Sequence, residues 1–282
     1  MLPSDLLQRY DRDGYFIVDG LVGPAQLPRM QEAAQHVKAK ARTGEVNLYN
    51  NYAGPSDPWV IDGLLTSAFG EPCFAEFMVS PALLEYAHFF LGPEIRLGYL
   101  GLLTNPARHD FNLGWHRDVL HLTAKDFAGP QPPGTNKLRW STALHDEANL
   151  SLVPGSHRRW GSDLENEAID TQNTAKIPGE KLIELTAGQT VFYDEKIIHR
   201  AYTRQVRERS SLFGTWARYD PAERKANPIP EMRWMLGDGI RDTFPPALRP
   251  YYDRWRQMHD SAAPLSPLIS HWDRSHEASG GH

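Results

Sequence analysis

Trp115-His116-Arg117-Asp118 is the stretch from which the fold and the chemistry of this chain are best read. A histidine and an aspartate lie two positions apart, so in an extended strand both side chains point to the same face of a sheet. Trp115 and Val119 flank the pair with bulky residues that strands favour. In a chain with 12 histidines, however, such a pair also arises by chance, and a metal site needs a further ligand from elsewhere.

That further ligand is found in His199, which lies far along the chain in the strand-like run 192–200. Two imidazoles and one carboxylate are the ligand set of facial iron(II) centres, which leave coordination positions open for other ligands. Zinc accepts the same donors. The ligand set therefore predicts a metal centre at His116, Asp118 and His199 without choosing the metal.

An arginine follows the distal histidine, because Arg209 stands at the start of the next strand-like run. Iron(II) with the three ligands above keeps about three free coordination positions, which suit a chelating 2-oxo acid and dioxygen. A 2-oxo diacid also needs a cation for its far carboxylate, and a guanidinium binds a carboxylate through two parallel hydrogen bonds. Arg207 would point to the same face of a strand, so the spacing predicts an anchor at either arginine.

The chain around these motifs consists of short extended runs separated by turns. Turn sequences rich in glycine and proline, such as residues 129–134, mark the breaks between them. The predicted strands are 96–104, 111–122, 138–144, 150–153, 182–185, 189–193, 197–203 and 211–219. About eight short strands in succession predict a mostly β fold with a two-sheet barrel or jelly roll at its centre.

Helical periodicity marks both ends of the chain. Apolar residues recur at helical spacing in 24–42 and 81–91, and a short helix at 3–12 precedes a strand at 15–18. Residues 45–58 are polar and predict a loop, whereas 231–236 and 250–259 predict C-terminal helices. We expect a single domain over residues 1–282, with a helical front and early strand (1–94), a jelly-roll core (95–220) and a helical C-terminal cover (221–282).

The composition excludes several classes of partner. The formal net charge of -5 and the pI of about 6.2 give no basic surface for nucleic acid or for a membrane. Cys73 is the one cysteine; it rules out an internal disulfide and is interpreted as a packed residue. The sequence shows neither a signal-peptide pattern nor an apolar run long enough to span a bilayer. We expect a cytoplasmic protein that acts on a small molecule, with its oligomeric state left open.

Several motifs resemble the phytanoyl-CoA dioxygenase family of iron(II)/2-oxoglutarate-dependent oxygenases. They are Trp115-His116-Arg117-Asp118, Val153-Pro154-Gly155-Ser156-His157, the His199…Arg209 spacing and the opening helix-to-strand pattern of residues 10–20. The resemblance extends to about Tyr219. It implies a cupin-like double-stranded β-helix core that binds iron(II) through His116, Asp118 and His199 and uses 2-oxoglutarate and O2 as cosubstrates.

The resemblance also assigns contacts to 2-oxoglutarate. It makes Arg209 a better candidate than Arg207 for the C5 carboxylate. It matches Trp140 to a position near the cosubstrate pocket, with Thr142 on the same strand face. Leu102 falls on another strand whose family counterpart lines that pocket.

The reaction that the resemblance implies is hydroxylation of a small organic substrate, with decarboxylation of 2-oxoglutarate to succinate and CO2. Asp118 argues against halogenation, because halogenating relatives carry glycine or alanine there. Desaturation, cyclisation, epoxidation or demethylation at the same centre are alternatives, as are a non-catalytic ligand- or metal-binding barrel and a zinc hydrolase or isomerase. His157 is interpreted as the anchor of its turn. Residues 145–153 and 200–204 depart from the family pattern, so the substrate stays open.

Overall fold

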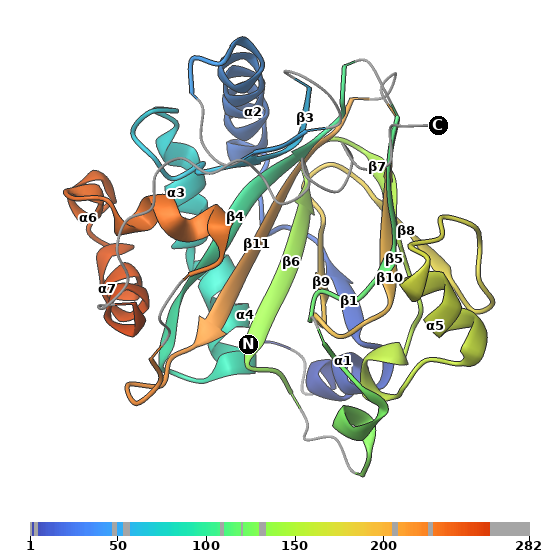
Figure 1. Ribbon diagram of the computed structural model, residues 1–282. Coiled ribbons are helices and arrows are strands. Elements are labelled where there is room, and N and C mark those ends of the chain that lie inside the picture. The colour runs from blue at the N-terminus through green and yellow to red at the C-terminus, as the bar shows by residue number, and fades with distance from the viewer. Residues whose placement is uncertain are drawn as a thin grey trace.

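The computed structural model describes residues 2, 5–46, 50–52, 57–107, 110–119, 121–129, 134–204, 208–224 and 228–259. Its centre consists of two antiparallel sheets that face each other (Figure 1). The larger sheet has seven strands in the order β1 (Tyr15–Val18), β9 (Thr190–Tyr193), β6 (Lys137–Ala143), β11 (Ser210–Arg218), β4 (Ile95–Thr104), β3 (Pro58–Asp62) and β2 (Asn50–Tyr52). The smaller has four, β5 (Phe111–His116), β10 (His199–Thr203), β7 (Glu147–Leu152) and β8 (Lys181–Leu185). The predicted mostly β jelly roll is confirmed.

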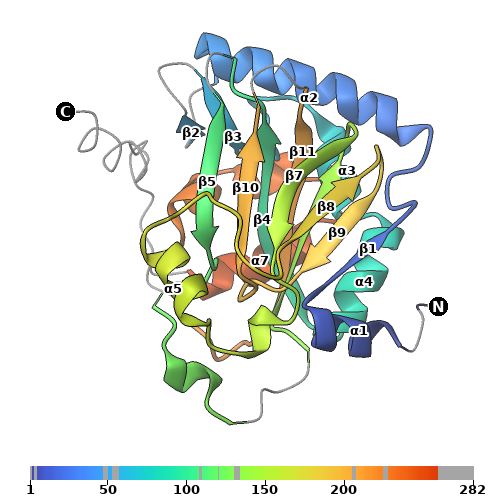
Figure 2. The ribbon, with the colours of Figure 1, turned by 90° about the vertical axis from the view of Figure 1, so that its right-hand side faces the viewer.

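Helices lie over the outer face of the larger sheet (Figures 1 and 2). The larger sheet is covered by α2 (Gln26–Thr43), α3 (Pro72–Met78), α4 (Pro81–Leu91) and α7 (Arg249–Met258), whereas α5 (Asp163–Asp170) packs beside β5 of the smaller sheet. The remaining short elements are α1 (Leu6–Asp13), η1 (Ala124–Phe127), η2 (Ser156–Arg158), η3 (Pro230–Leu236) and α6 (Ile240–Thr243).

Side-chain alternation along each strand separates two apolar cores. On the helix-covered face of the larger sheet, Leu102, Trp140 and Trp216 are fully buried in a cluster that runs from the front of the chain to α7. Between the sheets, Val191 and Ile183 belong to a second, smaller cluster. Because alternate residues of a strand point to opposite faces, each strand of the larger sheet contributes to both layers, and burial of both sets holds the sheet in place.

The structure differs from the predicted elements in four places. The predicted loop 45–58 was wrong in part, because the polar edge strand β2 and the first residue of β3 lie there. The predicted strand 111–122 was too long, since β5 ends at His116. Helices α3 and α5 were not predicted, although Ser162 and Glu165 form a capping box at the start of α5. The capping box would have been the signal for predicting this short helix.

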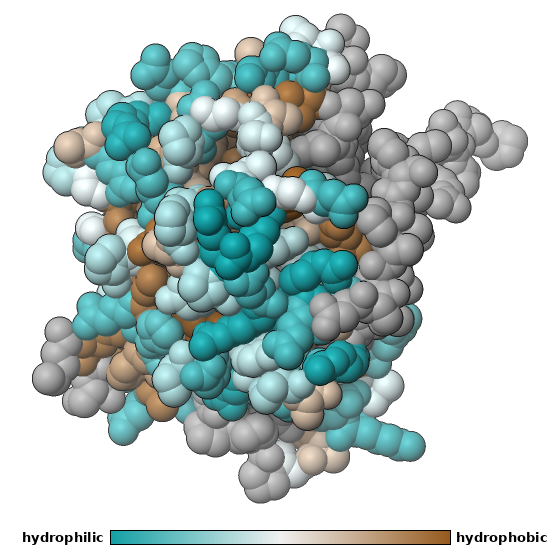
Figure 3. All heavy atoms as spheres, turned by 90° about the vertical axis from the view of Figure 1, so that its left-hand side faces the viewer, coloured by the Kyte–Doolittle hydropathy of each residue, from teal (hydrophilic) through white to brown (hydrophobic). Residues whose placement is uncertain are grey.

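The surface over the helices is mainly hydrophilic. Figure 3 shows this side, where hydrophobic residues form small separate areas among polar ones. Within the described residues, no helix combines the length and the apolar character needed to cross a membrane.

Candidate metal centre

The two predicted metal-binding histidines lie side by side on neighbouring strands. His116 is the last residue of β5, His199 is the first residue of β10, and the two are register partners in the smaller sheet. Their ring centroids are 4.2 Å apart. The long sequence separation is therefore closed by a single pair of antiparallel strands.

A β-bulge aims His116 at this point. Between the register pairs His199–His116 and Ala201–Leu113, β5 contains one residue more than β10, and bulges of this kind redirect side chains near active sites. Gly114 lies in the bulge, where an added Cβ would collide with the backbone carbonyl of Gln172. Only glycine therefore allows the chain to pass so close and still place His116 toward the interior.

Asp118 reaches the site from the bend that follows β5, not from the strand itself. Its backbone N–H donates to the carbonyl of Glu195 at 3.0 Å. The neighbouring Arg117 is buried and donates to the carbonyls of Ser156 and Arg159, at 2.9 and 3.1 Å. The expectation that one strand carries both ligands was wrong, because hydrogen bonds of the bend hold the carboxylate in place.

The side-chain donors of the three residues converge. Asp118 Oδ1 lies 3.6 Å from His116 Nε2, and its Oδ2 lies 3.3 Å from His199 Nε2. One ligand atom from each residue can be chosen so that all three lie within 4.8 Å of one another. This is the spacing that a single ion requires.

The imidazoles are also held in the orientation that a metal needs. His116 Nδ1 lies 2.7 Å from the carbonyl of Gly114, and His199 Nδ1 lies 3.0 Å from that of Ile197. Nδ1–H donation to a carbonyl leaves the Nε2 lone pair available for a metal. Burial lowers the pKa of His199 to about 4, so the ring is neutral at pH 7. The residues fit a divalent transition metal with open coordination positions.

A buried cation contacts the carboxylate ligand. Arg139 on β6 forms an ion pair with Asp118, with Nη1 2.8 Å from Oδ2. Burial by itself would raise the pKa of Asp118, but Arg139 and the two imidazoles hold it well below the usual value. The aspartate is therefore an anion, as metal binding requires.

Aromatic side chains hold Arg139 in place. Its guanidinium lies over the ring of Phe213, 4.9 Å from the centroid, and it hydrogen-bonds the hydroxyl of Tyr193. Tyr193 in turn lies 5.4 Å from the ring of His199. Sequence reasoning missed Arg139 and Tyr193, although the polar residues 139 and 141 alternate with the apolar residues 138 and 140 and mark one face of β6 as polar.

The predicted cosubstrate anchor lies buried between the sheets. Arg209, just before β11, donates from Nε to Glu147 Oε2 at 3.2 Å and to Ser211 Oγ at 3.3 Å. Its Nη1 donates to the hydroxyl of Thr203. The alternative anchor, Arg207, lies outside the described residues.

Three predicted cosubstrate contacts lie on the helix-covered side of the larger sheet. Trp140 and Leu102 belong to the core on the helix-covered face, and the indole of Trp140 packs against Phe77 of α3. Thr142 follows Trp140 by two residues and hydrogen-bonds Thr190 at 2.7 Å. Strand alternation places all three on the face opposite to that of the metal. Their role as cosubstrate contacts stays a prediction, and their observed contacts are those of the outer core.

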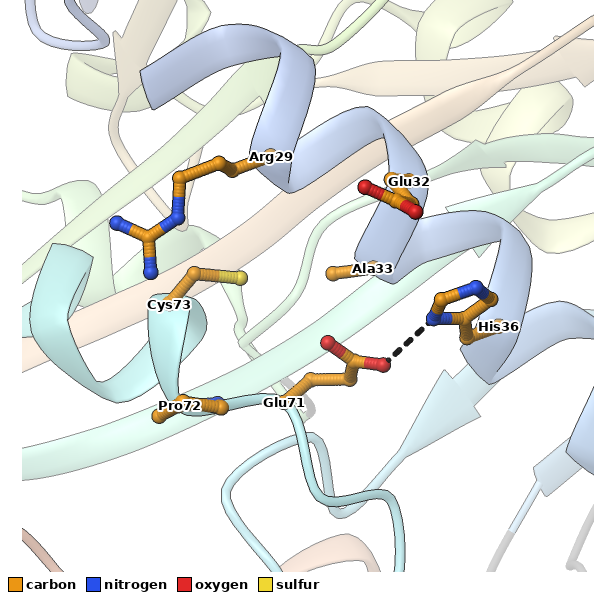
Figure 4. A pocket seen from close by; sticks show the side chains of 7 residues that line it. All are labelled: Arg29, Glu32, Ala33, His36, Glu71, Pro72 and Cys73. Carbon is orange, nitrogen blue, oxygen red and sulfur yellow. Dashed lines mark hydrogen bonds and ion pairs between the residues drawn. The ribbon is translucent and has the colours of Figure 1, made fainter. Parts of the chain in front are cut away.

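His157 and Cys73 lie away from the metal. His157 is buried, its Nε2 lies 3.1 Å from the carbonyl of Asp11, and burial lowers its pKa to about 4; it holds the turn against α1, as predicted. Cys73 borders a hollow of about 270 Å³ between α2 and α3, where His36 pairs with Glu71 (Figure 4). Burial raises the pKa of Cys73 to about 11, so its thiol stays protonated and unreactive.

Comparison with solved structures supports the fold. EctD from S. alaskensis, solved with 2-oxoglutarate and 5-hydroxyectoine, is 17% identical with a TM-score of 0.60, covering 77% of each chain. HygX from Streptomyces hygroscopicus, solved with nickel and 2-oxoglutarate, is 16% identical with a TM-score of 0.56, covering 77% of this chain and 88% of HygX. SnoK, a non-haem α-ketoglutarate-dependent carbocyclase from nogalamycin biosynthesis, is 16% identical with a TM-score of 0.56, covering 78% and 85%.

No curated protein sequence matches this chain. The family model described as phytanoyl-CoA dioxygenase (PhyH), however, matches residues 10–207, which is more than half of the chain and includes the three residues of the metal centre. With the jelly roll and the His-Asp-His cluster in place, this chain belongs to the phytanoyl-CoA dioxygenase family of non-haem iron/2-oxoglutarate oxygenases.

Proposed function

We propose that this protein is an iron(II)/2-oxoglutarate dioxygenase that hydroxylates a small organic substrate. Its iron would be bound by His116, Asp118 and His199. The observation that carries the proposal is the convergence of these three ligands, whose donor atoms lie within 4.8 Å of one another. Both imidazoles are already oriented by backbone carbonyls. A non-catalytic barrel would have no need of a metal site that leaves positions open for other ligands.

Each residue has a defined role in this proposal. His116, Asp118 and His199 hold the iron, and Arg139 keeps the carboxylate of Asp118 ionised and in place. Arg209, supported by Thr203, binds the C5 carboxylate of 2-oxoglutarate. When bound, iron(II) supplies activation of O2, with one oxygen atom going to succinate and the other to the substrate.

The inner wall of the site is buried. Tyr193 is 4% exposed and lies between the metal ligands and the inner core, and Phe213 packs over Arg139. A dry site strengthens the electrostatic contacts inside it and protects a reactive centre from side reactions. The protein thus contributes position and exclusion of solvent, while the chemistry belongs to the cofactor.

Replacement of a ligand tests the proposal. Asp118→Ala should abolish iron(II)-dependent formation of succinate from 2-oxoglutarate and should prevent tight binding of iron(II), measured by anaerobic calorimetry. His36→Ala, which removes an exposed histidine from α2, is the matched control and should behave as the wild type. Unchanged succinate formation in Asp118→Ala would refute the assignment of the site.

The outcome at the substrate is a separate question, because 5-hydroxyectoine appears with EctD whereas SnoK is named a carbocyclase. Product mass separates the alternatives: hydroxylation adds one oxygen atom, and desaturation or ring closure removes two hydrogens. We favour hydroxylation because Asp118 is present and the family assignment implies it. The single cysteine and the absence of a strongly basic composition further support a cytoplasmic enzyme with a small-molecule substrate.

A further inference from the structure

A second carboxylate lies against the arginine that is proposed to hold the cosubstrate. Glu147, the first residue of β7, is 7% exposed. Its Oε2 accepts from Arg209 Nε at 3.2 Å, from Ser211 Oγ at 2.5 Å and from Asn149 Nδ2 at 3.1 Å. Three donors on one oxygen hold this buried carboxylate in a fixed position beside Arg209.

Glu147 occupies one side of the Arg209 guanidinium, which is also the proposed binding group for the C5 carboxylate of 2-oxoglutarate. A guanidinium presents five N–H donors in a fixed plane. In Arg209 the Nε donor contacts Glu147 and Ser211, and Nη1 contacts Thr203. A C5 carboxylate must then bind at the Nη1–Nη2 edge, beside the negative charge of Glu147. Like charges repel most strongly in a buried site, where the effective dielectric constant is low.

We propose that Glu147 determines the cosubstrate affinity of this site, by partly neutralising Arg209 and thereby weakening the binding of 2-oxo acids that carry a distal carboxylate. The inference rests on the proposed function, because it takes Arg209 as the anchor of 2-oxoglutarate. The inference makes a specific prediction. A 2-oxo acid that lacks the second carboxylate makes no ion pair with Arg209, so its dissociation constant should not depend on the charge of Glu147. The site would then follow the concentration of 2-oxoglutarate instead of being saturated by it.

The test uses Glu147→Gln, which keeps the shape and an acceptor oxygen for Arg209 and Ser211 but removes the charge. The dissociation constant of 2-oxoglutarate is measured by calorimetry on the full chain loaded with manganese(II), a metal that suits oxygen donors and needs no turnover. We expect Glu147→Gln to bind 2-oxoglutarate about tenfold more tightly than the wild type. 2-Oxopentanoate, which has the same chain length and no C5 carboxylate, should bind both proteins equally.

Glu165→Gln is the matched control. Glu165 is as buried as Glu147 and is paired with Arg159, 2.6 Å away, on α5. Its removal should leave the dissociation constant of 2-oxoglutarate unchanged. Thermal unfolding of each variant establishes that the fold is intact, and Glu147→Met, which has a similar volume and no charge, replaces Glu147→Gln if the latter does not fold.

The outcomes separate this inference from the proposed function. The inference is supported if the Glu147 variant binds 2-oxoglutarate more tightly, while its binding of 2-oxopentanoate and the binding of 2-oxoglutarate by the Glu165 variant do not change. Unchanged or weaker binding of 2-oxoglutarate in that variant overturns it, as does equal tightening for 2-oxopentanoate. A metal-loaded wild type that binds no 2-oxoglutarate refutes the proposed function, and the inference with it.

Discussion

The two faces of strand β6 differ in almost every respect. On one face, Leu138 and Trp140 are fully buried in the core beneath the helices. On the other face, Arg139 forms an ion pair with Asp118, and its guanidinium packs on Phe213. Neighbouring residues of a single strand therefore have different roles. An error of one position in assigning the faces would mistake a core residue for a residue of the metal site.

This difference teaches that the polar residues of a strand mark the site and its large apolar residues mark the scaffold. Trp140 is the residue that looks functional by type, because aromatic residues often line ligand pockets. Arg139 looks unfavourable in a strand interior, yet it contacts a metal ligand. The two residues can be separated experimentally, since one should affect unfolding and the other metal binding.

Replacement of the scaffold residue should have the largest effect. Trp140→Ala removes a fully buried indole that packs on Phe77 and should lower the free energy of unfolding by about 3–5 kcal/mol. The measurement is urea unfolding of the metal-free protein. Because Trp140 faces away from the metal, the folded variant should keep the metal affinity of the wild type, and a loss of affinity at full folding would contradict the assignment of faces.

Replacement of Arg139 should give the opposite result. Arg139→Met leaves Asp118 without its cationic neighbour, and loss of such an outer partner typically costs about 10–100-fold in metal affinity. Calorimetry with manganese(II) gives the affinity, and urea unfolding of the metal-free protein gives the stability.

Arg139→Lys sharpens this test, because lysine keeps the charge but loses the planar fork of donors. It should retain part of the metal affinity. If Arg139→Met destabilised the metal-free protein as strongly as Trp140→Ala and left metal binding intact, the contrast between the two faces of β6 would fail.

Two buried histidines extend the comparison, since His199 serves the metal and His157 serves the scaffold. Burial lowers the pKa of His157 to about 4, whereas an unfolded histidine titrates near 6.5. Between these values the unfolded state binds the proton more strongly, so His157 makes stability fall as pH drops below about 6.5, with no further loss below about 4.

The size of this effect follows from the same two pKa values. Between pH 7 and pH 5, the metal-free wild type should lose about 2 kcal/mol more than His157→Gln, measured by urea unfolding at both pH values. Gln retains a donor for the carbonyl of Asp11 but does not titrate. Equal losses in the two proteins would show that His157 is not held neutral by its surroundings.

The smallest effect is expected at Thr142, on the same face as Trp140. Thr142→Val removes its hydrogen bond to Thr190 and should cost about 1 kcal/mol of unfolding free energy. The dissociation constant of 2-oxoglutarate should not change. A marked weakening of 2-oxoglutarate binding would restore Thr142 to the cosubstrate pocket.

Much of the fold followed from the sequence because strand and turn signals are local. Apart from β5, which ends six residues early, the strands from Ile95 onward lie close to their predicted positions, and α4 spans the predicted residues 81–91. Strands β2 and β3 were not predicted, because β3 is held by pairing with β4 and β2 by pairing with β3, and neither strand has a clear pattern of its own.

The metal cluster was predicted from the types and spacing of His116, Asp118 and His199. The structure confirms that these three side chains lie together. The contacts around it were harder to predict. Glu147 and Arg209 are far apart in sequence and meet only because β7 and β11 approach the same end of the barrel. Pairings of this kind depend on register, which a one-residue slip reverses.

Gly114 shows how a residue without a side chain can govern chemistry that it never touches. Its Cα passes so near the carbonyl of Gln172 that any larger residue forces β5 outward, and the imidazole two positions later would move with it. In a library of single substitutions, position 114 should thus be nearly as intolerant as the ligands themselves. The geometry of the metal centre is therefore set in part by a glycine, whose missing side chain leaves room for the carbonyl of Gln172.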